Sequence, residues 1–461
     1  MVLKGIHGRA HELTLLNAAT DLAKQGEPQL TVLMGRRRVG KTFLVQHHLN
    51  DLTGATPCYR AATRLSESDE IALCWEALRT SLPSLRDQAE PRRWSDLFDA
   101  LVDAALQQPV VLALDEVPYL VESSSSFATE LQRSWDRARH LARPPLLHLI
   151  LTGSALSTIS ELLSSRGALF ERPNQVIRLE PFDLPTSASY LRIADGTSAI
   201  ETFAATGGYP LLLDRWDTAA PAEENLIRLA GDPTGALATN ASTMLLDLPN
   251  AQPYLRVMSA VGRGASKFSE ISSHAGTRIE RPLTHLNGTG YLTQSRPIGD
   301  QRAAPIYELA DQYLRFWFAV VERDIQLIEA GQGEAVIRAA APRWNGLLAD
   351  TFEREARAHL VRLVRRGALD SDMLIGRWWT HRPRQIELDA VGLRGNNWAL
   401  IGEAKWSQRF SRADLNQLLA ARDALSQAEG ARLALFARTT FAPEVIEATE
   451  GALHLTASDL L

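Results

Sequence analysis

The stretch that most constrains the fold of this chain runs from Leu33 to Phe43 and reads LMGRRRVGKTF. A short apolar run over 30–34 precedes the loop, and a helical continuation is expected over 42–49. The loop between them has the pattern Gly-x-x-x-x-Gly-Lys-Thr of a phosphate-binding loop. A strand, a phosphate loop and a helix in this order predict an α/β fold with a parallel sheet.

The residue types in this loop suit a polyphosphate. Gly35 and Gly40 let the backbone turn its N–H groups inward, and the following helix directs its positive dipole end to the same point. Lys41 supplies a full charge, and the Thr42 hydroxyl is a ligand for Mg²⁺. A chance match is the alternative interpretation. The expected ATP-binding residues are Gly35, Arg36, Arg37, Arg38, Val39, Gly40, Lys41, Thr42 and Phe43.

A second signal follows in the stretch 109–116, which reads PVVLALDE. Its continuous apolar run predicts a strand buried on both faces of a parallel sheet. Two acids at the carboxyl end of such a strand lie where α/β sheets place their ligands. We expect Asp115 to hold Mg²⁺ through water and to join the nucleotide site, and Glu116 to polarise the attacking water.

Further polar residues are expected near the same edge. The apolar stretch 145–151 ends in Thr152-Gly-Ser154, and either hydroxyl could contact the γ-phosphate or orient the water, with Ser154 preferred. A helix N-cap by Ser154 or Ser157 is the alternative. Arg172 is favoured over Arg166 as an arginine finger, a role that a neighbouring subunit normally supplies, so a homo-oligomer is plausible. A Gly8-Arg9 pair is expected either beside the adenine or at a plain helix start.

Composition limits the class of protein. The chain has 461 residues and a net charge of −5, so any nucleic-acid binding must come from local basic patches. Cys58 and Cys74 are the two cysteines, which excludes a disulfide framework and suits a reducing, cytoplasmic setting. The N-terminus does not read as a signal peptide, and the sequence has no apolar run long enough for a membrane span.

The sequence predicts four domains: an ATPase core at 1–190, a helical lid at 191–240, a winged helix at 241–330 and a nuclease-like domain at 331–461. Three helices and a two-stranded wing are expected in the third, with basic residues suited to a phosphate backbone. These basic residues are Arg278, Arg281, His285, Arg296 and Arg302. A protein–protein module of the same fold is the alternative. The aromatic residues of 313–318 are expected to form a docking core rather than a base-stacking platform.

The last domain carries the residues that a metal-dependent phosphodiesterase needs. Asp389 and Glu403 are expected on adjacent strands, where they could hold Mg²⁺ or Mn²⁺. Lys405 lies two residues after Glu403, so both side chains leave one face of the strand, and Lys405 could orient the attacking water. Glu353 on a long helix is a further metal candidate, with Glu355 less favoured. A salt-bridged strand pair without nuclease activity is the alternative. Local positive charge is expected from Arg362, Arg365, Arg366, Arg377, Arg382 and Arg384.

Six motifs occur in a fixed order: GRRRVGKT, LDE, LTGS, TGGYP, DxYLRFW and GEAK. With them the chain resembles, over nearly its whole length, the archaeal-type AAA-superfamily P-loop ATPases that carry a C-terminal DUF234 domain. The resemblance implies an additional-strand P-loop fold, a winged helix and a C-terminal domain similar to the PD-(D/E)xK nucleases. It places Lys41, Thr42, Asp115 and Glu116 in nucleotide roles. Asp389, Glu403 and Lys405 match the nuclease motif, although Leu388 stands where that family has proline.

These signals together predict a Mg²⁺-dependent ATPase whose nucleotide state controls a DNA-directed, nuclease-like C-terminal domain. One alternative is a non-cleaving regulatory or defence switch that binds DNA or protein through the winged helix. Another is a remodelling motor that acts on a protein partner.

Overall fold

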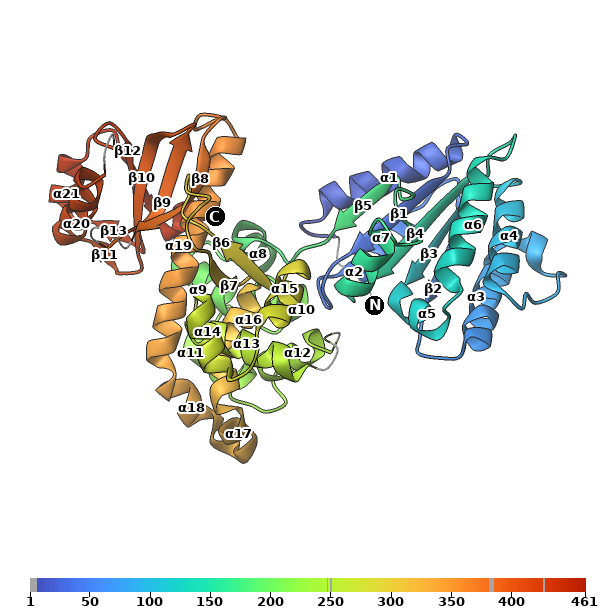
Figure 1. Ribbon diagram of the computed structural model, residues 1–461, viewed down its shortest axis with the longest axis horizontal. Helices are drawn as coiled ribbons and strands as arrows, with labels where there is room; N and C mark the ends of the chain where they lie inside the picture. Colours follow the sequence, from blue (N-terminus) through green and yellow to red (C-terminus); the bar gives the residue numbers. More distant parts are fainter. Residues whose placement is uncertain (1–5, 247, 249–250, 381–384, 426–427) are drawn as a thin grey trace. The chain divides into compact units, whose positions relative to one another are not determined.

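The computed structural model describes all residues except 1–5, 247, 249–250, 381–384 and 426–427. The chain divides into two compact units, residues 1–180 and 181–461, each with its own core (Figure 1). The four domain boundaries expected from the sequence stay predictions. Among the described helices, none combines the length and the apolar character that crossing a membrane requires.

The first unit is built on a five-stranded sheet in the order β2-β3-β4-β1-β5, and every neighbouring pair in it is parallel. Its strands are β1 (Gln29–Met34), β2 (Thr56–Ala61), β3 (Val110–Asp115), β4 (Leu147–Gly153) and β5 (Gln175–Arg178). Strand β4 lies between β1, which leads into the phosphate loop, and β3, which ends in the acids. This intervening strand confirms the α/β class and the additional-strand P-loop fold expected from the sequence.

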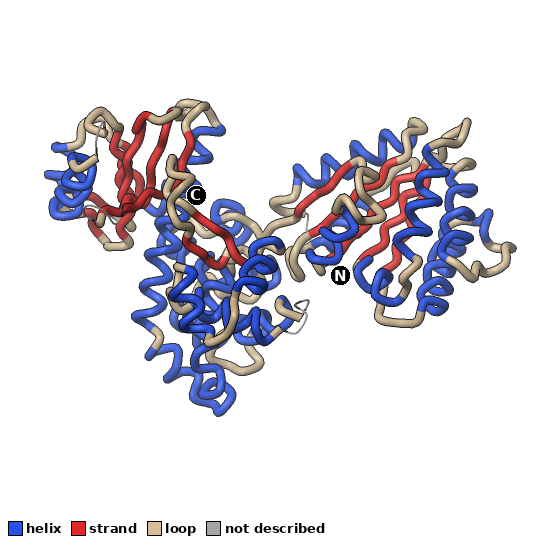
Figure 2. Tube along the Cα trace, in the orientation of Figure 1, coloured by secondary structure: helices blue, strands red, loops and turns tan. Residues whose placement is uncertain are grey.

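Helices lie over the two faces of this sheet (Figures 1 and 2). They are α1 (Ala10–Lys24), α2 (Lys41–Asn50), α3 (Glu67–Ser81), α4 (Trp94–Ala105), α5 (Val117–Ser123), α6 (Phe127–Arg139) and α7 (Leu156–Leu163), with a short turn at Pro83–Leu85. All six residues of β1 and of β3 are buried, as their apolar runs predict. The helical layers therefore exclude water from both faces of the central strands.

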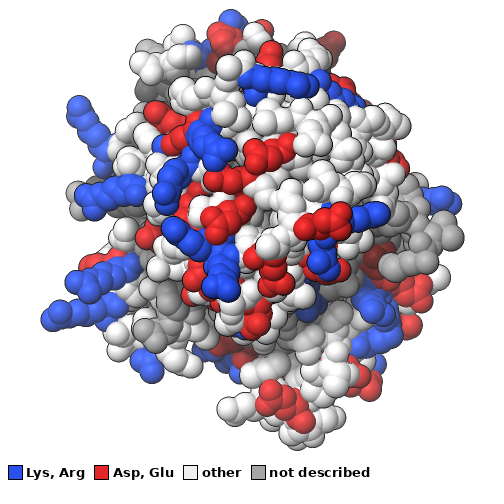
Figure 3. Space-filling view, turned by 90° about the vertical axis from the view of Figure 1, so that its right-hand side faces the viewer, with Lys and Arg blue, Asp and Glu red and all other residues white. Residues whose placement is uncertain are grey.

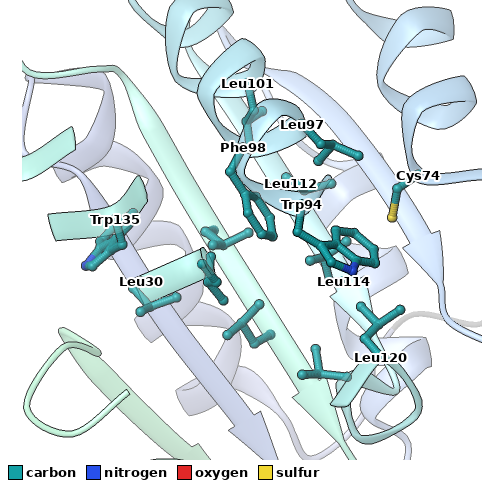
Figure 4. Packing of buried hydrophobic residues seen from close by; sticks show 14 of the residues in the cluster. Leu30, Cys74, Trp94, Leu97, Phe98, Leu101, Leu112, Leu114, Leu120 and Trp135 are labelled. Carbon is teal, nitrogen blue, oxygen red and sulfur yellow. The ribbon is translucent and has the colours of Figure 1, made fainter. Parts of the chain in front are cut away.

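Aromatic residues fill the core beside β3 (Figure 4). Trp94 stacks on Phe98, and its ring meets the ring of Phe127 edge to face at a centroid distance of 4.9 Å. Cys58 and Cys74 are free thiols buried in the same core, and burial raises the pKa of Cys58 to about 11 and that of Cys74 to about 12. This core fixes α3, α4 and α6 against the sheet.

Two buried histidines form hydrogen bonds between the sheet and helices α1 and α2. His148 on β4 bonds through Nδ1 to the Thr20 hydroxyl at 2.9 Å and through Nε2 to the Thr31 hydroxyl at 2.9 Å. His48 Nε2 lies 3.1 Å from the same Thr20 oxygen. Burial lowers the pKa of His148 to about 3 and that of His48 to about 4. Both rings are therefore neutral in the folded chain at pH 7.

Figure 3 views the side of the molecule that Figure 1 shows at the right, where the first unit lies. Acidic and basic side chains are interspersed over this face (Figure 3). The charge pattern of this face therefore does not resemble the continuous basic stripe that a nucleic-acid backbone attracts.

The second unit begins with helices around a tight double-glycine turn. They are α8 (Leu184–Leu191), α9 (Gly196–Thr206), α10 (Pro210–Leu213), α11 (Ala222–Leu229) and α12 (Ala236–Met244). A Cβ atom on Gly208 would lie 1.9 Å from the Phe182 carbonyl oxygen, and one on Gly207 would lie 2.5 Å from the Tyr313 nitrogen. Both glycines also have positive φ angles. Close backbone approach on two sides therefore requires the Gly-Gly pair.

The double-glycine turn packs against the aromatic segment 311–318. The hydroxyl of Tyr209 donates to Asp311 Oδ2 at 2.5 Å, and Tyr313 donates to the Leu237 carbonyl at 2.9 Å. Tyr313, Phe316 and Phe318 are almost completely buried. This burial confirms that the segment is a packing core rather than an exposed stacking platform.

Three helices and an antiparallel strand pair follow α12 in the order expected for a winged helix. They are α13 (Gln252–Gly262), α14 (Phe268–Ala275), α15 (Glu280–Gly288), β6 (Leu292–Ser295) and β7 (Ile306–Leu309). Gly276 caps α14 with a φ of 60°, as expected from the sequence. The assignment of this segment as a winged helix stays a prediction.

The C-terminal part holds a mixed sheet in the order β14-β12-β10-β9-β8. The strands β8, β9 and β10 pair antiparallel, whereas β10, β12 and β14 pair parallel. The sheet strands are β8 (Leu374–Thr380), β9 (Ile386–Arg394), β10 (Asn397–Lys405), β12 (Arg432–Ala437) and β14 (Leu453–Thr456), with a small separate pair, β11 (Arg409–Phe410) and β13 (Thr440–Phe441). The helices are α16 (Gln312–Phe316), α17 (Ile325–Leu327), α18 (Gly333–Ala339), α19 (Ala341–Arg365), α20 (Arg412–Asp423) and α21 (Pro443–Ala448).

The buried histidines generate a prediction about acid stability. A histidine in the unfolded chain binds a proton near pH 6.5, whereas the buried rings of the folded chain stay neutral at that pH. The contribution of these rings to the free energy of unfolding is therefore complete above pH 6.5 and decreases as the pH falls below it. The free energy of unfolding of the parent chain should therefore decrease between pH 7 and pH 5. In His148→Gln we expect this decrease to be smaller by about 2 kcal/mol. Denaturant titrations at the two pH values measure this difference.

His11→Gln is the matched control, because His11 is exposed on α1. An unchanged pH dependence in His148→Gln would contradict the assignment of a neutral buried ring.

Candidate functional site

The phosphate loop spans residues 35–40, between the end of β1 and the start of α2. Gly40 precedes α2 with a φ of 98°, a conformation that favours glycine. A Cβ atom on Gly35 would lie 2.4 Å from the Leu179 carbonyl oxygen, so a side chain does not fit there. Lys41 Nζ donates to the carbonyls of Gly35 at 2.8 Å and Arg36 at 3.0 Å, which places the ammonium over the loop.

The other loop residues have different surroundings. Val39 is completely buried, and Arg37 donates to the Tyr119 hydroxyl at 2.8 Å. Arg38 has a φ of 70°, the left-handed region, which helps the loop to turn. Phe43 is 39% exposed on α2, so it can contact a ligand only from the surface.

The side chain of Arg9 anchors the phosphate loop by hydrogen bonds, a role that was not predicted from the sequence. Its Nη2 donates to the Val39 carbonyl at 3.1 Å and to the Glu180 carbonyl at 2.7 Å. Glu12 lies 3.5 Å from its other terminal nitrogen. The buried guanidinium thus joins the start of α1 to the loop. The only sequence signal was the Gly-Arg pair, which does not show where the side chain bonds.

The carboxylate of Asp115 is the point at which four elements meet. Its Oδ2 accepts from the Thr42 hydroxyl of α2 at 2.6 Å and from the Tyr59 hydroxyl of β2 at 2.9 Å. Its Oδ1 accepts from the Thr152 hydroxyl of β4. Hydroxyl and carboxylate oxygens are the ligands that Mg²⁺ prefers, so this donor set fits the cation. Burial, followed by the charge of Asp115, raises the pKa of Tyr59, which remains a neutral donor.

Tyr59 was not found from the sequence. The parallel pairing of β2 with β3 places Ala61 opposite Asp115, and Tyr59 two residues earlier points its hydroxyl to the same carboxylate. This register depends on which strands are neighbours, and no local motif near Tyr59 indicates it.

Glu116 follows directly in a left-handed conformation, with a φ of 56°. This conformation is uncommon for glutamate and occurs often at functional sites. Its carboxylate accepts from the Ser154 hydroxyl at 2.8 Å and from the Ser154 backbone N–H at 3.2 Å. Ser154 therefore bonds to Glu116 and does not cap α7, whose N-cap residue is Ala155.

Arg172 is held within its own unit. Its Nε and Nη2 donate to the Asp136 carboxylate at 3.0 and 2.8 Å, and Nη1 donates to the Phe170 carbonyl at 2.9 Å. Asp136 lies on α6, so the pairing ties the segment after α7 to that helix. A finger role for Arg172 requires this ion pair to open, and it stays a prediction.

The C-terminal candidates lie on two adjacent antiparallel strands. Asp389 on β9 accepts through Oδ2 from the Ala404 backbone N–H of β10 at 2.9 Å. Glu403 and Lys405 leave the same face of β10, as their spacing predicts, and form an ion pair. The structure therefore brings together the three residues that the sequence singled out. It also shows the salt-bridged arrangement that was the alternative interpretation.

Glu353 on α19 lies within electrostatic reach of Asp389. Burial and, next, the Asp389 charge raise the pKa of Glu353, and the same two causes raise the pKa of Glu403. Burial raises the pKa of Asp389 as well. Burial raises the pKa of Glu355 to about 7, and the charges that act on it are those of Arg362 and other neighbours rather than that of Asp389. Glu353, rather than Glu355, therefore belongs to this acidic cluster.

A complete metal-binding group is not formed here. Among the described residues, no set of three His, Cys, Asp or Glu side chains has the arrangement needed to hold a metal ion. Arg357 donates to the Asp389 carbonyl at 2.6 Å and adds positive charge beside the cluster. The metal roles of Asp389, Glu403 and Glu353 stay predictions. Arg382 and Arg384, expected to add local positive charge, lie outside the described residues.

The chain is similar to known proteins in sequence and in fold. Residues 317–418 match the DUF234 family, described as archaeal and bacterial proteins of unknown function. An uncharacterized protein of Methanocaldococcus jannaschii is 24% identical over 86% of this chain and 87% of its own length.

Solved structures extend the comparison to the fold. A Walker-type ATPase of Pyrococcus abyssi aligns with 69% of this chain and 99% of its own, with a TM-score of 0.52 and 19% identity. The ORC2 protein of Aeropyrum pernix covers 73% of this chain at 12% identity and a TM-score of 0.44. The sheet order, the phosphate loop and the likeness to the Pyrococcus abyssi ATPase show that the first part of the chain has a P-loop ATPase fold, and residues 317–418 match the DUF234 family.

Proposed function

We propose that this protein is a Mg²⁺-dependent ATPase whose nucleotide state controls a DNA-directed, nuclease-like C-terminal domain. One observation carries the ATPase half. Thr42 from the phosphate-loop helix, Asp115 from the neighbouring acidic strand and Thr152 from the strand between them are joined through a single carboxylate. The closeness of these three side chains supports a cation site at the phosphate loop.

The roles follow from the positions. The loop N–H groups and Lys41 would bind the phosphates, and Thr42 with Asp115 would hold the cation, which neutralises charge on the phosphate oxygens. Glu116 is the base that orients the attacking water. The hydroxyl and the backbone N–H of Ser154 both donate to the same carboxylate oxygen, Glu116 Oε2. Ser154 therefore sets the direction of the base and would change its partner when a γ-phosphate enters.

A neighbouring subunit is proposed to complete the site. Arg172 already has a carboxylate partner, Asp136, whose side chain is 41% exposed. Screening by solvent makes such a pair weak, so its exchange for a phosphate of an adjacent copy is energetically accessible. A homo-oligomer in which Arg172 stabilises transition-state charge follows from this proposal.

The nuclease-like half rests on the placement of the acids. Asp389 and Glu403 lie on adjacent strands, Lys405 leaves the face of Glu403, and the charge of Asp389 acts on Glu353 of α19. Buried carboxylates that repel one another are stabilised by a divalent cation. A cation at this position would separate Glu403 from Lys405 and leave the ammonium to orient water or stabilise phosphorane charge.

DNA binding is proposed through the segment 252–309. Arg278 and Arg281 are exposed at the start of α15, and Arg296 and Arg302 are exposed around the β6–β7 hairpin. These four guanidinium groups suit a phosphate backbone. His285 differs, because its ring packs against Tyr254 at a centroid distance of 5.0 Å, so it is not proposed as a DNA contact.

A non-cleaving switch is the second candidate function. The ion pair between Glu403 and Lys405 favours it, because it neutralises both side chains that the chemistry needs. The lack of a ready three-residue metal group in the described part of the chain favours it too. In this alternative the protein binds DNA or a protein partner through the winged helix in an ATP-dependent way, and the nuclease-like domain is inactive.

The ATPase assignment predicts a separation of binding from turnover. Glu116→Gln keeps the shape of the side chain and removes the base, so we expect ATP binding to persist while turnover falls about 100-fold or more. Lys41→Ala removes the charge over the loop and should weaken ATP binding itself. Filter binding of labelled ATP and phosphate release with Mg²⁺ measure the two effects.

Glu161→Gln is the control for the charge change, since Glu161 is exposed on α7 outside the site. Unchanged turnover in both Lys41→Ala and Glu116→Gln would show that the site is assigned wrongly.

The nuclease assignment predicts cutting of plasmid or branched DNA by the full chain with Mn²⁺ and ATP. Asp389→Asn should reduce cutting about 100-fold, because the amide removes the charge that holds the cation. ATP turnover should remain. Asp423→Asn, an exposed site on α20, is the matched control. Persistent cutting by Asp389→Asn would overturn the metal role, and nucleotide-dependent DNA retention without cutting would establish the non-cleaving switch instead.

A further inference from the structure

The side chain of Tyr119 connects the phosphate loop to the helix that follows the acidic strand. Its hydroxyl accepts a hydrogen bond from Arg37 Nη2 at 2.8 Å. Tyr119 lies in the first turn of α5, where its backbone N–H donates to the Glu116 carbonyl at 3.0 Å. One side-chain contact therefore joins the loop after β1 to the turn that holds Glu116, the proposed base.

This contact crosses the carboxyl end of β4. Strand β4 lies between β1 and β3, so a side chain that joins the loop after β1 to the helix after β3 passes over the end of β4. The start of α5 covers the same point, because a Cβ atom on Gly153 would lie 2.8 Å from Pro118 Cδ. Thr152 and Ser154 flank Gly153 and bond to the two acids. The Arg37 guanidinium is thus directed to the place where the hydroxyls and the acids of the site meet.

A second guanidinium group covers the ring of Tyr119. Arg64 Cζ lies 4.8 Å from the ring centroid, which is within the range of a cation–π contact. Arg64 Nε also lies 3.5 Å from Glu122 Oε2 on α5. The ring therefore faces Arg64, while its hydroxyl bonds to Arg37.

The loop that carries Arg64 is held by a buried acid. Glu70 on α3 is completely buried, and its Oε1 accepts from the Thr63 backbone N–H at 2.7 Å and from the Thr63 hydroxyl at 2.8 Å. Its Oε2 lies 3.0 Å from Arg60 Nη2 of β2. A buried carboxylate with this many donors restricts the loop after β2 to one conformation. Arg64 is therefore presented to Tyr119 by an ordered loop.

The chemistry of Arg37 suits a terminal phosphate. A guanidinium group carries five N–H donors in a rigid fork, so Arg37 can keep its bond to Tyr119 and also donate to a phosphate oxygen. Hydrogen bonds between two charged groups are the stronger ones. ATP and ADP share the α- and β-phosphates, so a protein distinguishes them by groups directed at the γ-phosphate. Arg37 is directed from the loop toward the acids, where a γ-phosphate is expected.

We propose that Arg37, positioned by the Tyr119 hydroxyl, contacts the γ-phosphate and is the residue by which this chain distinguishes ATP from ADP. The proposal rests on the nucleotide site proposed above. Tyr119 does not touch the nucleotide in it and is a positioning residue. Because α5 begins directly after Glu116, a γ-phosphate bound by Arg37 would also act, through Tyr119, on the turn that holds the base.

The test compares two Mg²⁺-bound nucleotides on the full chain by calorimetry: ADP and the non-hydrolysable ATP analogue adenylyl imidodiphosphate. Arg37→Gln should weaken binding of the analogue about tenfold or more and that of ADP less than about twofold, because only the analogue has a γ-phosphate. Arg37→Lys keeps the charge but loses the fork, so it should retain more affinity for the analogue than Arg37→Gln. Arg133→Gln is the matched control, because Arg133 is exposed on α6.

Tyr119→Phe tests the positioning role. It removes the hydroxyl and keeps the ring beside Arg64, so binding of the analogue should weaken about three- to fivefold while ADP binding stays unchanged. The hydroxyl acts through Arg37, so adding Tyr119→Phe to Arg37→Gln should cause no further loss. Tyr190→Phe is the matched control, since the Tyr190 hydroxyl donates to Asp214 in the second unit.

ADP binding separates this proposal from the assignment of the nucleotide site. Analogue binding at the parent strength in Arg37→Gln, or equal weakening of both nucleotides, would overturn the proposal and leave the nucleotide site in place. Additive losses in the double variant would overturn the positioning role of Tyr119. A parent chain that binds neither nucleotide would overturn the nucleotide site, and this proposal with it. Thermal unfolding shows whether each variant is folded, and Arg37→Lys supplies the same comparison if Arg37→Gln is not.

Discussion

The carboxylate of Asp115 is the interaction on which the first unit depends. It accepts hydroxyl hydrogen bonds from Thr42, Tyr59 and Thr152, which come from α2, β2 and β4. Thr152 reaches Asp115 because β4 lies beside β3, so the strand order determines which side chains meet at this carboxylate. Glu116 follows in a left-handed conformation, and this turn directs its carboxylate to Ser154 on the end of β4. The sheet edge therefore positions Glu116, Asp115 and the phosphate loop together.

The second unit depends on a packing contact between two distant motifs. Gly207 and Gly208 leave no room for side chains because Tyr313 and Phe182 approach their backbones, and Tyr209 bonds to Asp311. The TGGYP and DxYLRFW motifs thus pack against each other and form one structural contact.

The sequence predicted the parts of the structure that local patterns encode. Apolar runs predicted the buried strands, and the phosphate-loop motif predicted the turn that the structure forms between β1 and α2. The residues that depend on neighbouring strands were missed, because the register of β2 on β3 brings Tyr59 to Asp115 and nothing near Tyr59 indicates that pairing. The spacing of Glu403 and Lys405 predicted a shared face, but not that their charges would meet. The ion pair of Arg172 with Asp136 was also not predicted, because Asp136 lies far away in the sequence, on α6.

The central claim is that the Asp115 carboxylate assembles the cation site that ATP hydrolysis needs. Asp115→Asn removes the charge but keeps an oxygen for the three hydroxyl groups, so the fold should persist. The most direct measurement is the rate of Mg²⁺-dependent phosphate release by Asp115→Asn, compared with Tyr59→Phe, which removes only one hydrogen bond to that carboxylate. The account predicts a fall of about 100-fold or more for Asp115→Asn and a much smaller fall for Tyr59→Phe. Turnover by Asp115→Asn at the parent rate, in a folded chain, would contradict it.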